Sequence, residues 1–286
     1  MDSSSRFSGI ERLYTPDGFA LLRKSHVAVV GLGGVGSWAA EALARSGVGA
    51  LTLIDPDDVC VSNTNRQLHA LDGTVGKPKA EVMAERLRRI HPDCTITTRQ
   101  VFLTRENAAS LLPAVLAGVV DAIDGVTAKA WLIAACRDAG IPVITCGAAG
   151  GKRDPSLVRT LDLAEVHDDR LMMYVRKKLR KRCEFPRVGK PMGVPCVFSP
   201  EPVFAPEGCV IEEPAEDEDL AAPTRLNCEG GLGAATFVTG VFGFIAAAWI
   251  VNTITGTAPT QQALNQAATW RQPRSARRDK TRVDES

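Results

Sequence analysis

His26-Val-Ala-Val-Val-Gly31-Leu-Gly33-Gly34-Val-Gly36 is the stretch that decides the fold. Its first five residues form a short apolar run, and a glycine-rich turn follows. A helix-length segment rich in alanine comes next, and a second apolar run ends at Asp55. This order predicts strand, helix and strand, and a right-handed crossover would make the two strands parallel in one sheet.

The glycines of this stretch predict a nucleotide site. Gly31, Gly33 and Gly36 fit the spacing G-x-G-x-x-G, in which the glycines allow a tight turn, close approach to a pyrophosphate and helix–strand packing. The following helix start offers free N–H groups to phosphate. Asp55 lies about 20 residues beyond the turn, where a carboxylate can bind a ribose. These residues alone leave NAD and other nucleotides equally open.

Composition sets broader limits on the class of protein. The chain has 286 residues, eight cysteines and a net charge of +1, so any nucleic-acid surface has to be a local patch. Residues 1–25 contain no apolar segment typical of a signal peptide. The cysteines form no CxxC pair, which argues against a zinc ribbon and indicates a reducing compartment. We therefore expect a cytoplasmic protein.

Strand-like and helix-like segments alternate after Asp55. We expect strands at 95–101, 119–124 and 142–147, and helices at 104–116 and 127–139, with a further helix that 76–80 opens, Pro78 near its first position, and that runs through residue 90. Such alternation predicts an α/β protein with a Rossmann-like, mostly parallel sheet and helices on both faces.

Four polar residues are predicted to meet at one edge of this sheet. Ligands bind outside the carboxyl ends of parallel strands, and Asp55, Arg66 and Asp124 follow such ends, while Lys79 opens a helix nearby. Two acids beside a triphosphate imply Mg²⁺, which offsets like charges. An NAD site needs no such set, so the pattern favours ATP. The chain lacks a G-x-x-x-x-G-K-[ST] loop and is not a P-loop protein.

Five motifs in order resemble the adenylation domain of ubiquitin-activating-type enzymes, which use ATP to convert a carboxylate to an acyl-adenylate. They read Gly31-Leu-Gly-Gly34-Val-Gly36-Ser-Trp38, Leu53-Ile-Asp55-Pro-Asp57, Asn63-Thr-Asn65-Arg66-Gln67, Gly76-Lys-Pro-Lys79 and Asp121-Ala-Ile-Asp124.

Within that superfamily the chain resembles the tRNA threonylcarbamoyladenosine dehydratases. Further marks of this family are His69-Ala70, Gly147-Ala-Ala-Gly150-Gly151, Cys196-Val-Phe-Ser199 and Cys228-Glu-Gly-Gly-Leu-Gly233. The resemblance implies ATP-dependent closure of a threonylcarbamoyl group on tRNA into a cyclic ester. The threonine carboxylate is adenylated, and the neighbouring carbamoyl oxygen then displaces AMP, so the net change in the nucleoside is loss of water.

The resemblance also implies the roles of individual residues. Arg12, Arg66, Lys79 and Asp124 would be catalytic, with Arg12 reaching into the partner's site of a homodimer and Asp124 binding Mg²⁺. The nucleotide-binding set implied by the motifs is Gly31, Gly33, Gly34, Gly36, Asp55, Asp57, Ser62, Asn63, Asn65, Arg66, Lys79, Asp124 and Gly125. Without the resemblance, Arg12 reads as surface charge.

Two other functions stay open at this point. An adenylating enzyme for a ubiquitin-like sulfur-carrier protein would share these motifs, but its bacterial-type members usually carry paired CxxC zinc ligands, which this chain lacks. A sulfur-relay protein is a further candidate partner of the dehydratase. A Rossmann protein that binds NAD is the third alternative.

We expect one domain, 1–255, with two insertions in its second half. A basic helix at 168–182 could contact tRNA phosphates, and an acidic, proline-rich loop occupies 200–223. The apolar segment 234–253 predicts an extra C-terminal helix. It is long enough to associate with a membrane, but its small residues favour a helix buried in the protein or at a dimer interface. The polar, basic tail 256–286 is predicted to be disordered.

Overall fold

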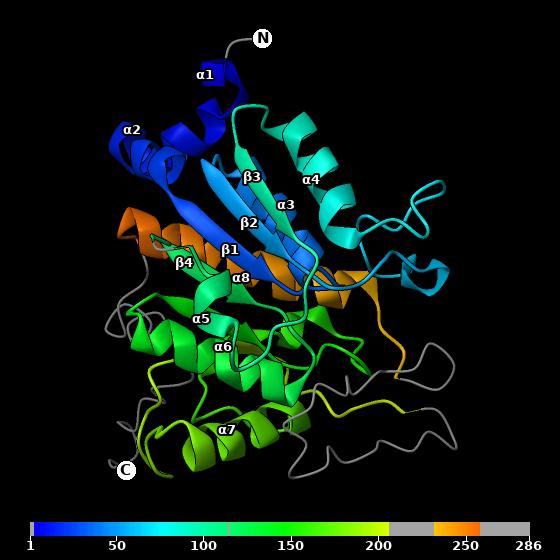
Figure 1. Cartoon of the computed structure of the whole chain (residues 1–286), viewed down its shortest axis with the longest axis vertical. Helices are drawn as coiled ribbons and strands as arrows, with labels where there is room; N and C mark the ends of the chain where they lie inside the picture. The colour runs from blue at the N-terminus through cyan, green and yellow to red at the C-terminus, as the bar shows by residue number, and fades with distance from the viewer. Residues whose placement is uncertain (1–2, 114, 206–231, 258–286) are drawn as a thin grey trace, which may run out of the picture.

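The computed structural model describes residues 3–113, 115–205 and 232–257, and it contains a seven-stranded sheet (Figure 1). The strands are β1 (His26–Val30), β2 (Ala50–Ile54), β3 (Thr95–Arg99), β4 (Gly118–Asp121), β5 (Val143–Cys146), β6 (Arg159–Asp162) and β7 (Pro195–Phe198). Their order is β3-β2-β1-β4-β5-β7-β6, with β6 antiparallel to β7 and the other neighbours parallel. The predicted mostly parallel sheet is confirmed.

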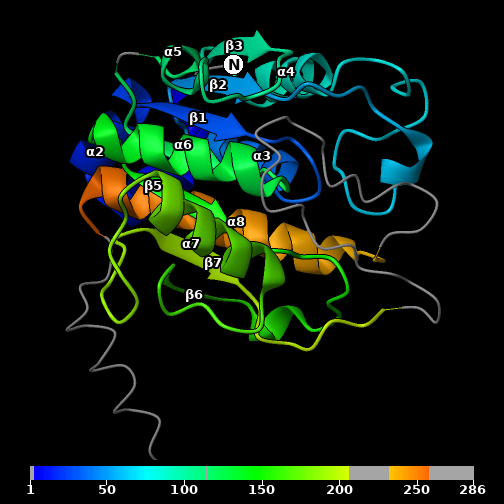
Figure 2. The ribbon, with the colours of Figure 1, turned by 60° about the horizontal axis from the view of Figure 1, so that its bottom comes forward.

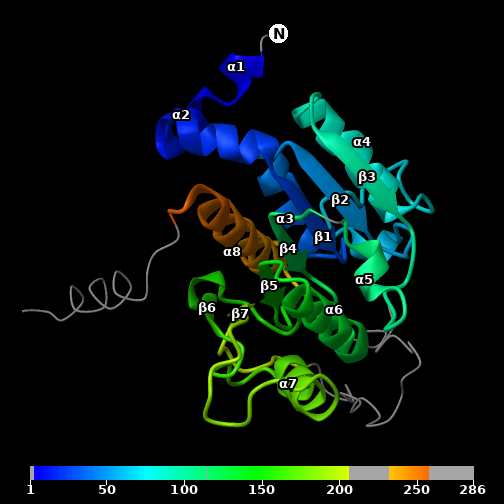
Figure 3. The same cartoon turned by 60° about the vertical axis from the view of Figure 1, so that its left-hand side comes forward.

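Helices cover both faces of the sheet, as predicted. They are α1 (Ser3–Arg6), α2 (Ser8–Lys24), α3 (Gly36–Arg45), α4 (Lys79–Ile90), α5 (Ala108–Leu111), α6 (Val126–Asp138), α7 (Arg170–Arg182) and α8 (Thr236–Thr255), with short 3₁₀ turns at Val61–Asn63 and Pro155–Leu157. One apolar core joins α2, α3, α4 and α8 to the sheet, and a second joins α5, α6 and α7 to the opposite face. Figure 3 shows α8 and α6 on opposite sides of the strands.

Several predicted elements are shorter than the sequence indicated, one helix and one strand most clearly. The helix expected at 104–116 is reduced to α5, because Leu112 adopts an extended conformation before Pro113, as residues before proline commonly do. The strand expected at 119–124 ends at Asp121, whose carboxylate accepts a hydrogen bond from the N–H of Ile123 and turns the chain.

The sheet extends further than the sequence analysis expected. Strands β7 and β6 add an edge beyond β5, at the opposite end of the sheet from β3 (Figure 2). The basic helix begins at Arg170, not at residue 168, because Asp169 caps its start through the N–H of Met172 and Asp168 has a positive φ of 54°.

The predicted C-terminal helix is present as α8, which packs along α3 and beneath β4 and β5. Its core-facing side includes Val238, Phe242, Ala246 and Ile250. It is the one described helix long and apolar enough to cross a membrane, and half of that window is buried inside the protein. The acidic loop beyond residue 205 and the tail from residue 258 lie outside the described residues, so the boundary at 255 stays a prediction.

Candidate functional site

The glycine turn lies between β1 and α3 and is packed directly against the end of β4. Gly31 has a φ of +85°, and a Cβ placed there would lie 2.6 Å from the carbonyl oxygen of Ala122. A Cβ at Gly36 would lie 1.7 Å from the carbonyl oxygen of Gly31. Only glycine fits these two positions, so the turn keeps its backbone close to any ligand at the carboxyl edge of the sheet.

Asp55 fixes this turn to the end of β2. Its carboxylate accepts hydrogen bonds from the N–H groups of Leu32, at 2.5 Å, and Asp57, at 2.9 Å. The residue is buried, and this burial raises the pKa of Asp55, while the positive charge of Lys79 acts in the opposite direction. The acid predicted at the end of the second strand is therefore anchored at the glycine turn.

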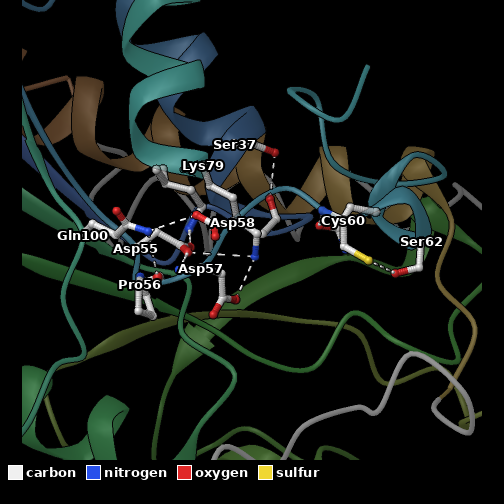
Figure 4. Close-up of polar contacts among 12 residues, drawn as sticks. Ser37, Asp55, Pro56, Asp57, Asp58, Cys60, Ser62, Lys79 and Gln100 are labelled. Atoms are coloured by element: carbon white, nitrogen blue, oxygen red, sulfur yellow. Dashed lines mark hydrogen bonds and ion pairs between the residues drawn. The ribbon is translucent and has the colours of Figure 1, made fainter. Parts of the chain in front are cut away.

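Lys79 begins α4 and reaches between two carboxylates, as Figure 4 shows. Its Nζ lies 2.8 Å from Asp57 Oδ2 and 3.9 Å from Asp55 Oδ1. The Lys79 side chain is 7% exposed, whereas that of Asp57 is 58% exposed. An anionic ligand that arrives from solvent can therefore compete with Asp57 for a lysine that is already desolvated and aimed at the site.

Asp124 stands in the turn between β4 and α6 and faces the same group of charges. Part of Asp124 reaches solvent, but the surrounding protein desolvates its carboxyl group and raises its pKa. The like charge of Asp57 raises this pKa further, and Lys79 lowers it. Gly125 caps the start of α6 next to it. The structure thus brings Asp124, Asp57 and Lys79 together.

The polar segment 62–66 lies beside the glycine turn. Arg66 donates hydrogen bonds to the carbonyl of Ser62 and to the side chain of Asn65, and its Cγ would lie 3.4 Å from a Cβ at Gly34. Asn63 accepts a hydrogen bond from the N–H of Cys60 and shapes the segment. Asn65 also donates to the carbonyl of Ala234, which ties this segment to the start of α8. Ser62 and Asn65 remain exposed.

Arg12 is not part of this group within one chain. It is exposed on α2, which ends where β1 begins. It therefore belongs to the amino edge of the sheet, whereas the other predicted site residues follow the carboxyl ends of the strands.

Several buried polar residues near the site were given no role by the sequence motifs. Asp121 and Lys129 form a fully buried ion pair, and an isolated lysine inside the apolar helix segment was the signal that could have found it. His69 and Gln67 are also buried, and both ring nitrogens of His69 and Oε1 of Gln67 have no hydrogen-bond partner among the described residues. Burial and the nearby charge of Lys79 lower the pKa of His69 to about 4, so its ring is neutral at physiological pH.

The donor set fits a magnesium ion held through phosphates and not a closed protein metal site. Among the described residues, no three histidine, cysteine or acidic side chains are grouped to hold a metal. Asp124 and Asp57 could offer carboxylate oxygens at an open face, and Mg²⁺ is commonly bound by one or two carboxylates together with substrate phosphates.

Comparisons with known proteins agree with this architecture. A model of the ThiF family matches residues 9–285. The tRNA threonylcarbamoyladenosine dehydratase of Escherichia coli (strain K12) is 48% identical over 246 residues, which cover 84% of this chain and 90% of that protein. A crystal structure of the Escherichia coli enzyme in complex with ATP has a TM-score of 0.79 and 44% identity, and the match covers 90% of this chain and 97% of that one. The chain therefore belongs to the ThiF family and, within it, to the tRNA threonylcarbamoyladenosine dehydratases, as the motifs predicted.

The alternative relatives match much less of the chain. The sulfur carrier protein ThiS adenylyltransferase of Escherichia coli is 39% identical over 136 residues, which cover 47% of this chain and 53% of that protein. This partial match is typical of a shared adenylating core. It does not extend over the rest of the chain, so it gives no support to a sulfur-carrier protein as the substrate.

Proposed function

We infer that the chain catalyses the ATP-dependent dehydration of threonylcarbamoyladenosine in tRNA to its cyclic form. The observation that carries this inference is the match to a dehydratase along nearly the whole length of both proteins. The convergence of the glycine turn, Lys79 and the acids around it at one sheet edge supports it independently, because carboxylate adenylation needs a phosphate cradle with a nearby cation.

The reaction consists of two substitutions. The free carboxylate of the threonyl group attacks the α-phosphorus of ATP, an O–P bond forms, and pyrophosphate leaves. The carbamoyl oxygen of the same group then attacks the activated carbonyl carbon, the new C–O bond closes the ring, AMP leaves, and the carbamoyl nitrogen releases its proton to solvent. Because this second step is intramolecular, correct orientation alone can supply up to about 7–11 kcal/mol of its rate enhancement.

The residues at the glycine turn would bind and orient the nucleotide. The backbone N–H groups from Gly31 to Gly36 would surround the phosphates, and Asp55 would accept hydrogen bonds from the ribose. The remaining motif residues, Ser62, Asn63, Asn65 and Arg66, would complete the phosphate side of the site. Lys79, once a phosphate replaces Asp57, would stabilise the charge that develops at the α-phosphate.

Asp124 would hold Mg²⁺ at the open face of the site, with Asp57 close enough to share the charge of the ion. In this position Asp124 would hold a divalent cation whose charge offsets that of the triphosphate and of the two acids. The exposed position of Asp124 at this edge, within reach of the negative charge of Asp57, supports this role, because a cation offsets two neighbouring carboxylates.

The active enzyme would be a homodimer, in which Arg12 of each subunit completes the partner's site. The exposure of Arg12 and of its apolar neighbour Leu13, which is 72% exposed, supports this assignment. The tRNA backbone would bind along exposed cations of α7 such as Lys177 and Lys181. A sulfur-relay protein would be a further partner. The enzyme would be cytoplasmic, with α8 as a helix of the protein core and not a membrane anchor.

Nucleoside mass spectrometry of total tRNA tests the proposal directly. The tRNA comes from cells that lack any such dehydratase and is treated with the purified protein and ATP–Mg²⁺. We expect the threonylcarbamoyladenosine to lose the mass of one water only when ATP is present. An unchanged mass with a preparation that binds ATP would overturn the proposal and direct attention to a protein carboxy-terminus as substrate.

A further inference from the structure

A fully buried ion pair lies beneath the turn that carries Asp124. Asp121 ends β4 and Lys129 lies in the first turn of α6; both side chains are 0% exposed, and Lys129 Nζ is 2.9 Å from Asp121 Oδ2. Thr145 of β5 completes the cluster, since its hydroxyl donates to the same carboxylate oxygen at 2.7 Å and accepts from Lys129 at 3.1 Å.

The contacts of this cluster hold both ends of the turn. Asp121 Oδ1 accepts a hydrogen bond from the N–H of Ile123 at 3.2 Å, and Lys129 Nζ donates to the carbonyl of Asp121 at 3.3 Å. The backbone N–H of Lys129 donates to the carbonyl of Gly125 at 3.0 Å. Asp124 therefore lies between Ile123, whose N–H is bonded to the Asp121 carboxylate, and Gly125, whose carbonyl is bonded by the helix backbone at Lys129.

Fold stability alone does not account for burying these charges. A buried ion pair is often no more stabilising than apolar side chains of similar volume, because both charges lose their hydration. Its advantage is geometric, since the bonds are directional and the partners cannot move apart in the core. The charge of Lys129 also acts on the Asp124 carboxyl group in the turn above.

We propose that the Asp121–Lys129 pair, with Thr145, is a positioning device that sets Asp124 for the metal–nucleotide complex. This inference rests on the proposed role of Asp124. Outer partners of metal ligands orient them, and their loss typically weakens metal binding about 10- to 100-fold.

The test compares wild type with the double variant Asp121→Asn/Lys129→Met, which removes both charges and keeps the volumes. The first readout is the Mg²⁺ concentration that half-saturates ATP binding, measured by equilibrium titration; the second is turnover. We expect this Mg²⁺ concentration to rise about 10-fold or more. In an Asp124→Ala background, the same pair of substitutions should change it by less than about twofold, because residues that act through one another are not additive.

Two further variants keep the outcome decisive if the double variant folds poorly. Thr145→Val removes one hydroxyl from the cluster and should raise the Mg²⁺ requirement in the same direction by less. Ile133→Val, buried on the same helix, controls for a loss of stability without a change at the pair. A Mg²⁺ requirement that is unchanged in both the double variant and Thr145→Val would overturn the inference. So would a double substitution that raises this requirement equally in the wild-type and Asp124→Ala backgrounds. An Asp124→Ala protein with the wild-type Mg²⁺ requirement would instead contradict the proposed role of Asp124 on which the inference rests, whereas the proposed dehydration is tested separately by nucleoside mass spectrometry.

Discussion

Two lysine–aspartate pairs lie at the same sheet edge and differ in burial. Lys79 and Asp57 are 2.8 Å apart, and Lys129 and Asp121 are 2.9 Å apart. The Asp57 side chain is 58% exposed, whereas neither member of the second pair reaches solvent. Similar geometry therefore serves two purposes: an anionic ligand can replace the exposed acid of the first pair, but nothing can enter the second without unfolding the turn.

Lys79 combines burial with an exchangeable partner, which is what a phosphate-binding lysine requires. Its desolvation strengthens any interaction with an anion, because the effective dielectric constant is low. Asp57 holds the ammonium group in place at 2.8 Å. Asp124 stands between the two pairs and is affected by the charges of both lysines, so substitutions at these five residues can separate binding, positioning and stability.

The largest effect is expected at the carboxylate between the pairs. Asp124→Ala should lower turnover by about 10³-fold or more, because it removes the proposed metal ligand. Its thermal unfolding should stay close to wild type, since the side chain is partly in solvent. Asp58→Asn is the matched control, because Asp58 in the same region is exposed and bonded to Gln100. Normal turnover of the Asp124→Ala protein would remove this residue from the site.

Breaking the buried pair should lower the free energy of unfolding more than breaking the partly exposed pair. Lys129→Met leaves the Asp121 carboxylate buried and uncompensated, and the free energy of unfolding should fall by about 3–5 kcal/mol. Asp57→Asn breaks the partly exposed pair and should cost at most about 1 kcal/mol. Chemical denaturation of both variants measures the difference. Equal losses would mean that burial does not distinguish the two pairs.

Catalysis should depend on Lys79 and not on the neighbouring Lys77. Lys79→Ala should lower turnover about 10²–10³-fold, because it removes a preorganised positive charge from the α-phosphate. Lys77→Ala, two residues earlier and exposed, should leave it within about twofold, as surface substitutions usually do. Initial rates at saturating ATP–Mg²⁺ provide the measurement. A comparable loss in both variants would indicate general electrostatic attraction in place of a specific contact.

The sequence predicted the parts of the fold that depend on local pattern. The strand, glycine turn and helix from His26 to Arg45 follow from apolar periodicity and from glycines that no larger residue can replace. The ends of β1 and β2 and the start of α4 placed Asp55 and Lys79 at one edge, because parallel strands share their carboxyl edge. Family membership followed from the motifs in order, and the comparisons confirmed it.

The remaining features depend on contacts between distant segments. Lys129 reads as an exposed helix residue, and its burial depends on Asp121 and Thr145 from two other strands. Strand β7 and the edge strand β6 are four residues each and show little periodicity. Arg12 cannot be placed at a site from local pattern, because one chain keeps it at the other edge of the sheet.

A third buried polar group near Lys79 gives the smallest predicted effect. Burial lowers the folded-state pKa of His69 to about 4, below the unfolded value of 6.5. Between these values the unfolded chain binds a proton that the folded protein excludes, so the free energy of unfolding falls as the pH decreases. This one residue should remove about 2 kcal/mol between pH 8 and pH 5. His69→Leu should lose that part of the decline in denaturation experiments at the two pH values, while His26 and His91 stay in both proteins and cancel in the difference. A decline as steep in the variant as in wild type would contradict this prediction. It would mean that the ring of His69 is protonated or hydrogen-bonded in the folded protein.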